Sequence, residues 1–188
     1  ITAKFENPNK DRLAPEFVKN IADIVNAQAG DTLPVSVFAD KADGTIPAGT
    51  TAYEKRGVAV NVPEWQADKC IQCNNCAFVC PHAVIRPFLL TEEEAANAPE
   101  GVKLTQGKAV FKEYKFGISV SVLDCTGCGN CADVCPSKEK ALIMKPLGTQ
   151  EAEQENFNWL HSHVGYKDNV QPKTGNIKNA QFAQPLFE

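Results

Sequence analysis

All eight cysteines of this 188-residue chain fall into two short runs with the same spacing. Each run reads C-x2-C-x2-C-x3-C-P, and the two runs occupy residues 70–81 and 125–136. Three thiolates spaced in this way can wrap one face of a cuboidal iron–sulfur cluster, whereas the fourth cysteine points away and ligates a second cluster. The chain is therefore expected to bind two [4Fe-4S] clusters and to exchange their fourth ligands.

The expected ligands form two crossed sets, called site one and site two below. Site one takes Cys70, Cys73, Cys76 and Cys135, and site two takes Cys125, Cys128, Cys131 and Cys80. Because the crossing ties both halves of the repeat together, loss of one cluster should loosen the other. Four protein ligands leave no iron with an open position, which favours electron transfer over substrate chemistry at the metal. Gly127 and Gly129 are expected to let backbone N–H groups approach sulfur.

Zinc and disulfides are the competing uses of these cysteines. Structural zinc sites pair C-x2-C hooks across a longer gap, and a disulfide framework spreads its cysteines to tie distant loops together. Two proline-terminated quadruplets fit neither pattern. The clustering, with an N-terminus that lacks a signal-peptide pattern, predicts metal binding in a reducing cytoplasm.

Composition argues against several other functions. A formal net charge of −4 and a pI near 5.5 provide no basic surface for nucleic acid or an anionic membrane. No apolar run approaches the roughly 18 residues that a membrane span needs. Neither a Ser–His–Asp arrangement nor a phosphate-binding glycine-rich loop is present. Because the sequence begins with Ile1 and not Met, we expect it to come from a longer protein.

Hydrophobic periodicity places a strand on each side of both cysteine runs. The unit of strand, cysteine loop, short helix and strand recurs after 55 residues, the separation of Cys70 and Cys125, and the inserted segment 91–115 makes this period long. The expected strands cover 34–39, 58–62, 83–90, 116–122 and 141–144. The expected helices lie within 15–29, begin with a capping box at Thr91, and span 149–163. A dry shell around the clusters is expected from Ile71, Phe78, Val79, Val84, Ile85, Val134, Leu142 and Ile143.

Residues 66–147 resemble two-cluster bacterial ferredoxins, and their flanks narrow the resemblance further. The motifs resemble those of pyruvate:ferredoxin (or flavodoxin) oxidoreductase at Tyr53-Glu54-Lys55-Arg56-Gly57, Val62-Pro63-Glu64-Trp65, 70–73, 80–83, 122–129 and 138–142. The closing segment 184–188 resembles the linker that, in this family, leads to a thiamine diphosphate domain. The resemblance is strong from about residue 50 to residue 147 and weaker outside that range.

This resemblance implies an α+β fold with a pseudo-twofold repeat, an N-terminal α/β flank, and a C-terminal helix and linker. The implied parts are the end of a preceding domain (1–50), a linker segment (51–65), the two-cluster domain (66–147), and a helix with a linker (148–188).

The resemblance also implies a function. The segment would pass single electrons from the oxidative decarboxylation of a 2-oxo acid, pyruvate, to ferredoxin or flavodoxin. Thiamine diphosphate, Mg and a third [4Fe-4S] cluster would belong to the rest of the parent enzyme, a cytoplasmic homodimer, so this segment alone would not oxidise pyruvate. A free-standing two-cluster ferredoxin, or an electron-transfer subunit of another anaerobic oxidoreductase, is the alternative.

Several other residues could have a functional role, but each also has a simpler structural explanation. His82 is expected to pack or to tune a cluster rather than ligate it, and Trp65 is expected to be a packing anchor rather than an electron relay. His161 and His163 fit a solvated helix end. Five basic residues lie near the cysteine runs, namely Lys55, Arg56, Lys138, Lys140 and Lys145. They could bind an acidic electron acceptor or screen the charge of a cluster, but salt bridges or a solvated surface explain their presence equally well.

Overall fold

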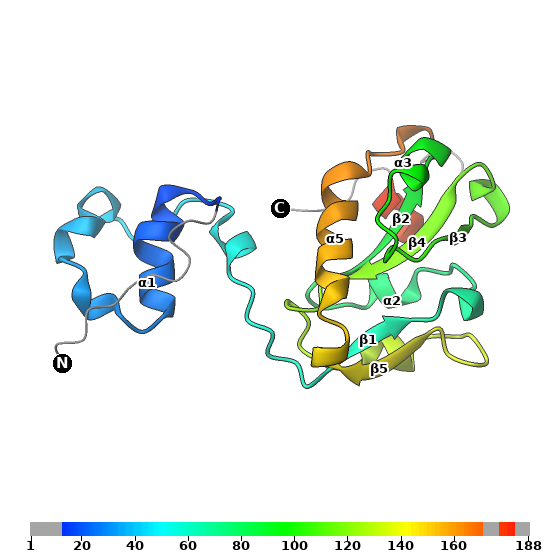
Figure 1. Cartoon of the computed structure of the whole chain (residues 1–188), viewed down its shortest axis with the longest axis horizontal. Coiled ribbons are helices and arrows are strands. Elements are labelled where there is room, and N and C mark those ends of the chain that lie inside the picture. Colours follow the sequence, from blue (N-terminus) through cyan, green and yellow to red (C-terminus); the bar gives the residue numbers. More distant parts are fainter. Residues whose placement is uncertain (1–12, 171–176, 183–188) are drawn as a thin grey trace. The chain divides into compact units, whose positions relative to one another are not determined.

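The computed structural model describes residues 13–170 and 177–182, which divide into two compact units (Figure 1). The first unit extends to Lys55 and the second begins at Arg56. The expected linker at 184–188 lies outside the described residues. The finer domain boundaries expected from the sequence stay a prediction.

The described part of the first unit, residues 13–55, is helical and contains no strand. The helix expected within 15–29 is confirmed: a π-helical turn, Val18–Ala22, continues into α1, Asp23–Asn26. Short 3-10 helices follow at Gly30–Thr32, Val35–Lys41 and Thr50–Tyr53. The strand expected over 34–39 is therefore wrong, and so is the α/β character expected for this flank.

The second unit contains two small antiparallel sheets and is α+β. One sheet pairs β1, Asn61–Trp65, with β5, Leu142–Pro146. The other has the order β2-β4-β3, from Ile85–Leu90, Lys115–Val120 and Thr105–Gln106. Each sheet thus joins a strand beside the first cysteine run to a strand beside the second, so the two halves share both sheets.

Strand β1 begins later than the sequence suggested. The alternating residues Val58 and Val60 are 64% and 82% exposed, and the strand starts only at Asn61. Pro63 lies inside β1 opposite Met144. A proline is tolerated there because β1 has a partner on one edge only.

The core of the second unit is built around β4. Phe116 is completely buried, with the ring of Trp65 at 6.1 Å and that of Phe182 at 6.2 Å, both in edge-to-face geometry. Helix α5, Ala152–His163, packs along β4, as the orange helix in Figure 1 shows. Nearly all residues of β4 are buried, because α5 packs on the strand and Phe182 of the 177–182 segment packs against Phe116.

Helix α5 also fixes the entry to the second cysteine run. Its buried Gln154 accepts a hydrogen bond from the Leu123 N–H at 3.0 Å and donates one to the Ser121 hydroxyl at 3.1 Å. Ser121 in turn donates to the Asp124 carboxylate. The turn that leads into Cys125 is therefore held by one side chain from a distant helix.

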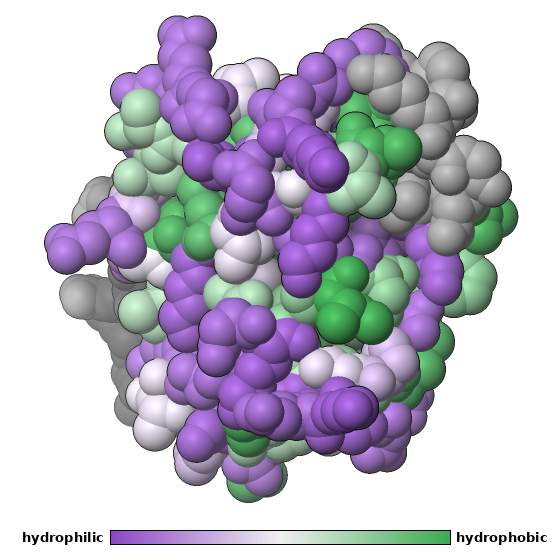
Figure 2. Space-filling model, turned by 90° about the vertical axis from the view of Figure 1, so that its right-hand side faces the viewer, coloured by the Kyte–Doolittle hydropathy of each residue, from purple (hydrophilic) through white to green (hydrophobic). Residues whose placement is uncertain are grey.

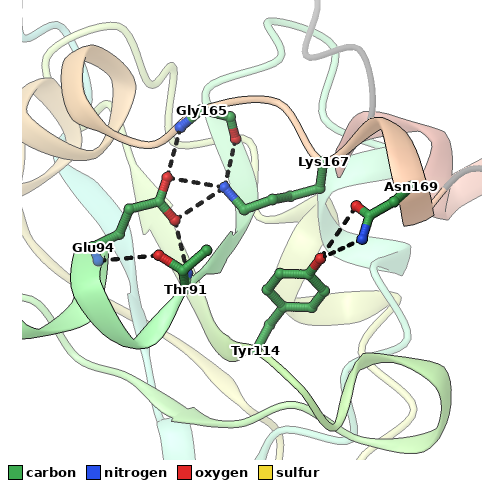
Figure 3. Close-up of polar contacts among 6 residues, drawn as sticks. All are labelled: Thr91, Glu94, Tyr114, Gly165, Lys167 and Asn169. Atoms are coloured by element: carbon green, nitrogen blue, oxygen red, sulfur yellow. Dashed lines mark hydrogen bonds and ion pairs between the residues drawn. The ribbon is translucent and has the colours of Figure 1, made fainter.

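Helix α3, Glu92–Ala96, starts with the expected capping box at Thr91. The Glu94 N–H donates to the Thr91 hydroxyl at 3.2 Å, and the Thr91 N–H donates to the Glu94 carboxylate at 2.7 Å. Figure 3 shows that the same carboxylate binds Gly165 and Lys167, while Tyr114 binds Asn169. These contacts attach the chain after α5 to the inserted segment 91–115.

The surface of the second unit seen in Figure 2 is mostly hydrophilic, with small separate hydrophobic patches. Among the described residues, no helix combines the length and the apolar character needed to cross a membrane.

Candidate metal centre

All eight cysteines lie in the second unit as free thiols. The first and third cysteines of each run are buried, namely Cys70, Cys76, Cys125 and Cys131. Two short helices inside the runs, α2 (Asn75–Phe78) and α4 (Asn130–Asp133), carry the third cysteines and pack against each other. This contact brings the two cysteine loops together.

Cys80, the fourth cysteine of the first run, lies with the first three cysteines of the second run. All four line one cavity of about 330 Å³, a volume that includes its opening to solvent. Val84, Ile85 and Met144 form part of its apolar wall. The cavity therefore collects the four residues expected at site two, from loops more than 40 residues apart in the sequence.

Cys135 lies correspondingly close to the first run. The Ser137 hydroxyl donates a 2.8 Å hydrogen bond to the carbonyl of Lys69, which joins the chain after Cys135 to the residue before Cys70. Burial raises the pKa of the Cys70 thiol, and the nearby Cys73 and Cys135 raise it further. Burial likewise raises the pKa of Cys125, with Cys80 and Cys128 adding to it.

Backbone N–H groups point at sulfur in both loops. Gln72 donates to Cys70 Sγ and Gly127 donates to Cys125 Sγ, each at 3.4 Å, and Ala141 donates to Cys135 Sγ at 3.3 Å. Such donors stabilise negative charge on sulfur and are a main control of cluster potential.

The two loops share an unusual backbone pattern that makes these contacts possible. Positive φ angles occur in pairs one repeat apart: 60° at Gln72 with 71° at Gly127, and 57° at Asn74 with 80° at Gly129. The first loop therefore adopts with side-chain-bearing residues the left-handed conformation that the second loop achieves with glycine. The approach to sulfur expected for Gly127 is confirmed.

The cysteine thiols can bind soft metal ions, which displace the protons from sulfur. Burial, opposed in part by a backbone hydrogen bond, raises the pKa of both Cys76 and Cys131 to about 12, so both are neutral thiols in the absence of metal. Metal binding would release these protons and create the thiolates that ligate iron. The buried indole Nε1–H of Trp65, which has no hydrogen-bond partner among the described residues, is a further polar group that such a centre would satisfy. The donor set thus fits the expected clusters.

Within the described residues, no group of three or more His, Cys, Asp or Glu side chains is placed to hold a metal ion. A cubane distributes its four protein ligands over four irons, so its thiolates do not need to converge on one point.

Two lysines place positive charge on cysteine carbonyls of site one. Lys108 Nζ donates to the carbonyl of Cys70 at 2.9 Å, and Lys140 Nζ donates to that of Cys135 at 2.9 Å. Lys140 was among the residues with a possible screening role. The contact of Lys108 was not predicted from the sequence, because Lys108 lies in the inserted segment, 38 residues from Cys70, and belongs to no recognisable local motif.

Other residues singled out from the sequence lie as follows. His82 is exposed on the rim of the site-two cavity, and His161 and His163 are exposed on α5, where they stack on Phe157 and Trp159. The expected dry shell is only partly correct. Val84, Ile85 and Leu142 are buried, but Ile71 is 52% and Phe78 is 58% exposed, and Val134 also reaches the surface, because these three lie on the outer side of the cysteine loops.

We expect Gly127→Ala to impair the site more than Gly129→Ala. Both substitutions force a left-handed residue, at about 1–2 kcal/mol. Only at Gly127 would the new Cβ also lie 2.9 Å from a backbone oxygen, that of Asn61, whereas nothing lies within 4 Å of the corresponding position at Gly129. Urea unfolding midpoints of the two variants, measured anaerobically, test this order; equal midpoints would contradict it.

Comparison with known families agrees with this geometry. Residues 69–139 match a family described as a 4Fe-4S dicluster domain. Residues 4–59 match a second family, named EKR and described as a domain of unknown function. The first match spans both cysteine runs, including all eight expected ligands.

Curated relatives match nearly the whole chain. Pyruvate-flavodoxin oxidoreductase of Enterobacter agglomerans is 54% identical over 174 residues, and pyruvate:ferredoxin oxidoreductase of Moorella thermoacetica is 52% identical over 178 residues. Each match covers 93% of this chain and 15% of the relative. The chain is a homologue of one segment of these oxidoreductases. A further relative, pyruvate dehydrogenase [NADP(+)] of Cryptosporidium parvum, is 46% identical over 176 residues, 92% of this chain and 9% of the relative.

The chain therefore contains a 4Fe-4S dicluster domain, preceded by a match to the EKR family. This confirms the family expected from the Glu54-Lys55-Arg56 motif and the cysteine runs. The chain spans about 15% of the length of the first of these relatives, which are much larger proteins.

Proposed function

We propose that this segment carries two [4Fe-4S] clusters with crossed ligands, site one and site two as defined above, and that it passes single electrons between them. The observation that carries the proposal is the cavity that Cys80 lines together with Cys125, Cys128 and Cys131. A run that supplied all four ligands to its own cluster would not send its last cysteine into the cavity of the other run.

Site one is supported by the matching arrangement on the other side. Cys135 lies close enough to Cys70 to raise the pKa of that thiol, and the Ser137–Lys69 hydrogen bond holds the two chain segments together. We also propose that the two halves are related by a pseudo-twofold axis. The repeated positive φ angles and the crosswise pairing of β1 with β5 and β2 with β4 support this symmetry.

We further propose that the electrons come from oxidative decarboxylation of a 2-oxo acid, pyruvate, elsewhere in a cytoplasmic, homodimeric parent enzyme. The names of the relatives support the substrate. Thiamine diphosphate, Mg and a third [4Fe-4S] cluster would serve that reaction outside this segment. The acceptor would be ferredoxin or flavodoxin.

The side chains prepare the two sites for one-electron chemistry. Bound there, each cluster would accept and release one electron. Four thiolates and an oxidised four-iron core leave about −2 at each site, and reduction adds a further negative charge. The N–H groups of Gln72, Gly127 and Ala141 stabilise that charge on sulfur. Burial of the cysteine sulfurs in an apolar core destabilises the added negative charge and lowers the reduction potential.

Metal analysis tests the proposal directly. The holoprotein, purified or reconstituted without oxygen, should contain about eight irons and about eight acid-labile sulfides. Reduction should bleach its visible absorption and produce the paramagnetic signals of two interacting clusters. Zinc without sulfide, or cystine bridges between the runs, would contradict the proposal.

A further inference from the structure

The indole of Trp65 stands out as a buried polar group without a partner. Its side chain is 5% exposed, and Nε1 makes no hydrogen bond to the described residues. A buried indole N–H normally has an acceptor, and leaving such a donor unsatisfied costs about as much as a hydrogen bond contributes. The packing role expected from the sequence explains the ring, which lies against Phe116, but not the nitrogen.

Three contacts place residue Trp65 beside site one. Trp65 ends β1 opposite Leu142 of β5, and the next residue, Gln66, donates its N–H to the Ala141 carbonyl at 2.8 Å. The Ala141 N–H in turn donates to Cys135 Sγ. Cys70 lies in the same apolar cluster as the indole. Burial raises the pKa of the Cys70 thiol, and the Trp65 side chain lies close enough to Cys70 for its N–H donor to lower that pKa in part, although the geometry falls short of a full hydrogen bond.

We propose that the Trp65 Nε1–H donates a hydrogen bond to Cys70 Sγ when that sulfur ligates the site-one cluster, and that this bond raises the reduction potential of site one. The inference rests on the proposed clusters. A neutral thiol is a weak acceptor, whereas an iron-bound thiolate carries the negative charge that strengthens such a bond. Because reduction adds charge to the cluster and its sulfurs, the bond stabilises the reduced state more than the oxidised state.

The second loop does not reproduce this donor. One repeat after Trp65 stands Val120, which has no side-chain donor. The effect should therefore be confined to site one and separate the potentials of two otherwise similar centres. In this role Trp65 is a positioning and tuning residue, because it acts on the cluster through one of the ligands.

The test replaces only the N–H donor and measures potential. In the holoprotein, Trp65→Phe should lower the potential of one cluster and leave the other unchanged in redox titrations followed by EPR. The expected shift is about tenfold in the ratio of reduced to oxidised cluster at a fixed potential, or about 59 mV for a one-electron couple. Trp159→Phe, at the only other tryptophan, is the matched control and should change neither potential.

Two further measurements separate tuning from packing. Benzothienylalanine at position 65 keeps the bicyclic shape without the N–H and should reproduce the shift. With indole-¹⁵N labelling, ENDOR of the reduced protein should show nitrogen coupling that Trp65→Phe removes and Trp159→Phe retains. Unchanged potentials in both position-65 variants, with about eight irons present, would overturn this inference and leave the proposed function standing. Absence of iron from the wild-type protein would instead overturn the proposed function.

Discussion

Cys80→Ser should remove about four of the eight irons and should empty the site formed by the other cysteine run. Serine is a poor ligand for the iron of a cluster that prefers thiolate. Since Cys80 shares its cavity with Cys125, Cys128 and Cys131, the cluster lost is expected to be site two. Site one keeps all four of its ligands, although the crossed connection should make it more labile.

Thiol mapping can identify which cluster is lost. Anaerobic alkylation followed by peptide mass spectrometry should modify the three second-run cysteines of site two in Cys80→Ser while site one stays protected. Cys135→Ser is the mirror control and should expose Cys70, Cys73 and Cys76 instead. Uncrossed ligation predicts the reverse: in Cys80→Ser the labelled residues would then be Cys70, Cys73 and Cys76.

The features that sequence predicted best are local. Cysteine spacing specified the loops, and the capping box at Thr91 specified the start of α3, because both depend on residues within one or two turns of each other. The strands beside the runs were also found, since their apolar residues face a core from both sides.

The errors have two physical reasons, the absence of a partner strand and the path of the loop backbone. Val35 and Phe38 belong to a run with strand-like composition, but they are 89% and 42% exposed and residues 13–55 contain no strand to pair with them, so the chain forms a 3-10 helix instead. Ile71 and Phe78 were expected in the shell because they are apolar neighbours of cysteine. The direction in which each residue points depends on the loop backbone, where positive φ values at Gln72 and Asn74 reverse the chain.

Apart from the crossed cysteines, contacts between distant segments were not predicted from the sequence. Gln72 binds the inserted segment by accepting from the Lys108 N–H at 2.8 Å and donating to the Gln106 carbonyl at 2.9 Å. No sequence pattern near Gln72 or Lys108 predicts this pairing. The inserted segment therefore acts as a brace for the first cysteine loop, a role that only the folded structure reveals.

Lys167→Met should destabilise the second unit by about 2–3 kcal/mol. Lys167 and Glu94 are separated by 73 residues and form a buried ion pair at 3.0 Å, with side chains 8% and 20% exposed (Figure 3). Methionine retains most of the packing but leaves the Glu94 carboxylate without its cation, and breaking one side of a buried pair is costly. The Lys167 backbone N–H also binds Phe182, so the loss should loosen the segment that covers Phe116.

A more exposed ion pair, whose carboxylate also belongs to helix α3, supplies the control. Lys115 lies 3.3 Å from Glu92, whose side chain is 73% exposed, so Lys115→Met should cost under about 1 kcal/mol. In anaerobic urea unfolding, the midpoint of Lys167→Met should fall by about 1 M, as expected for ordinary urea slopes, and that of Lys115→Met much less. Equal shifts in urea midpoint for the two variants would show that the buried ion pair contributes no more to stability than the exposed one.

Acidification should weaken the ion pair between Lys167 and Glu94 by protonating the Glu94 carboxylate. Burial raises the pKa of Glu94, but hydrogen bonds from Thr91, Gly165 and Lys167 outweigh it and hold the pKa below its ordinary value of 4.5. A carboxylate with a depressed folded-state pKa contributes stability that is fully present above pH 4.5 and is lost as the pH falls through the lower folded value. The advantage of wild type over Glu94→Gln in urea midpoint should therefore be constant at neutral pH and shrink below pH 4.5. Because cluster loss in acid affects both proteins alike, their difference isolates Glu94; an advantage that grows on acidification would contradict the ion pair.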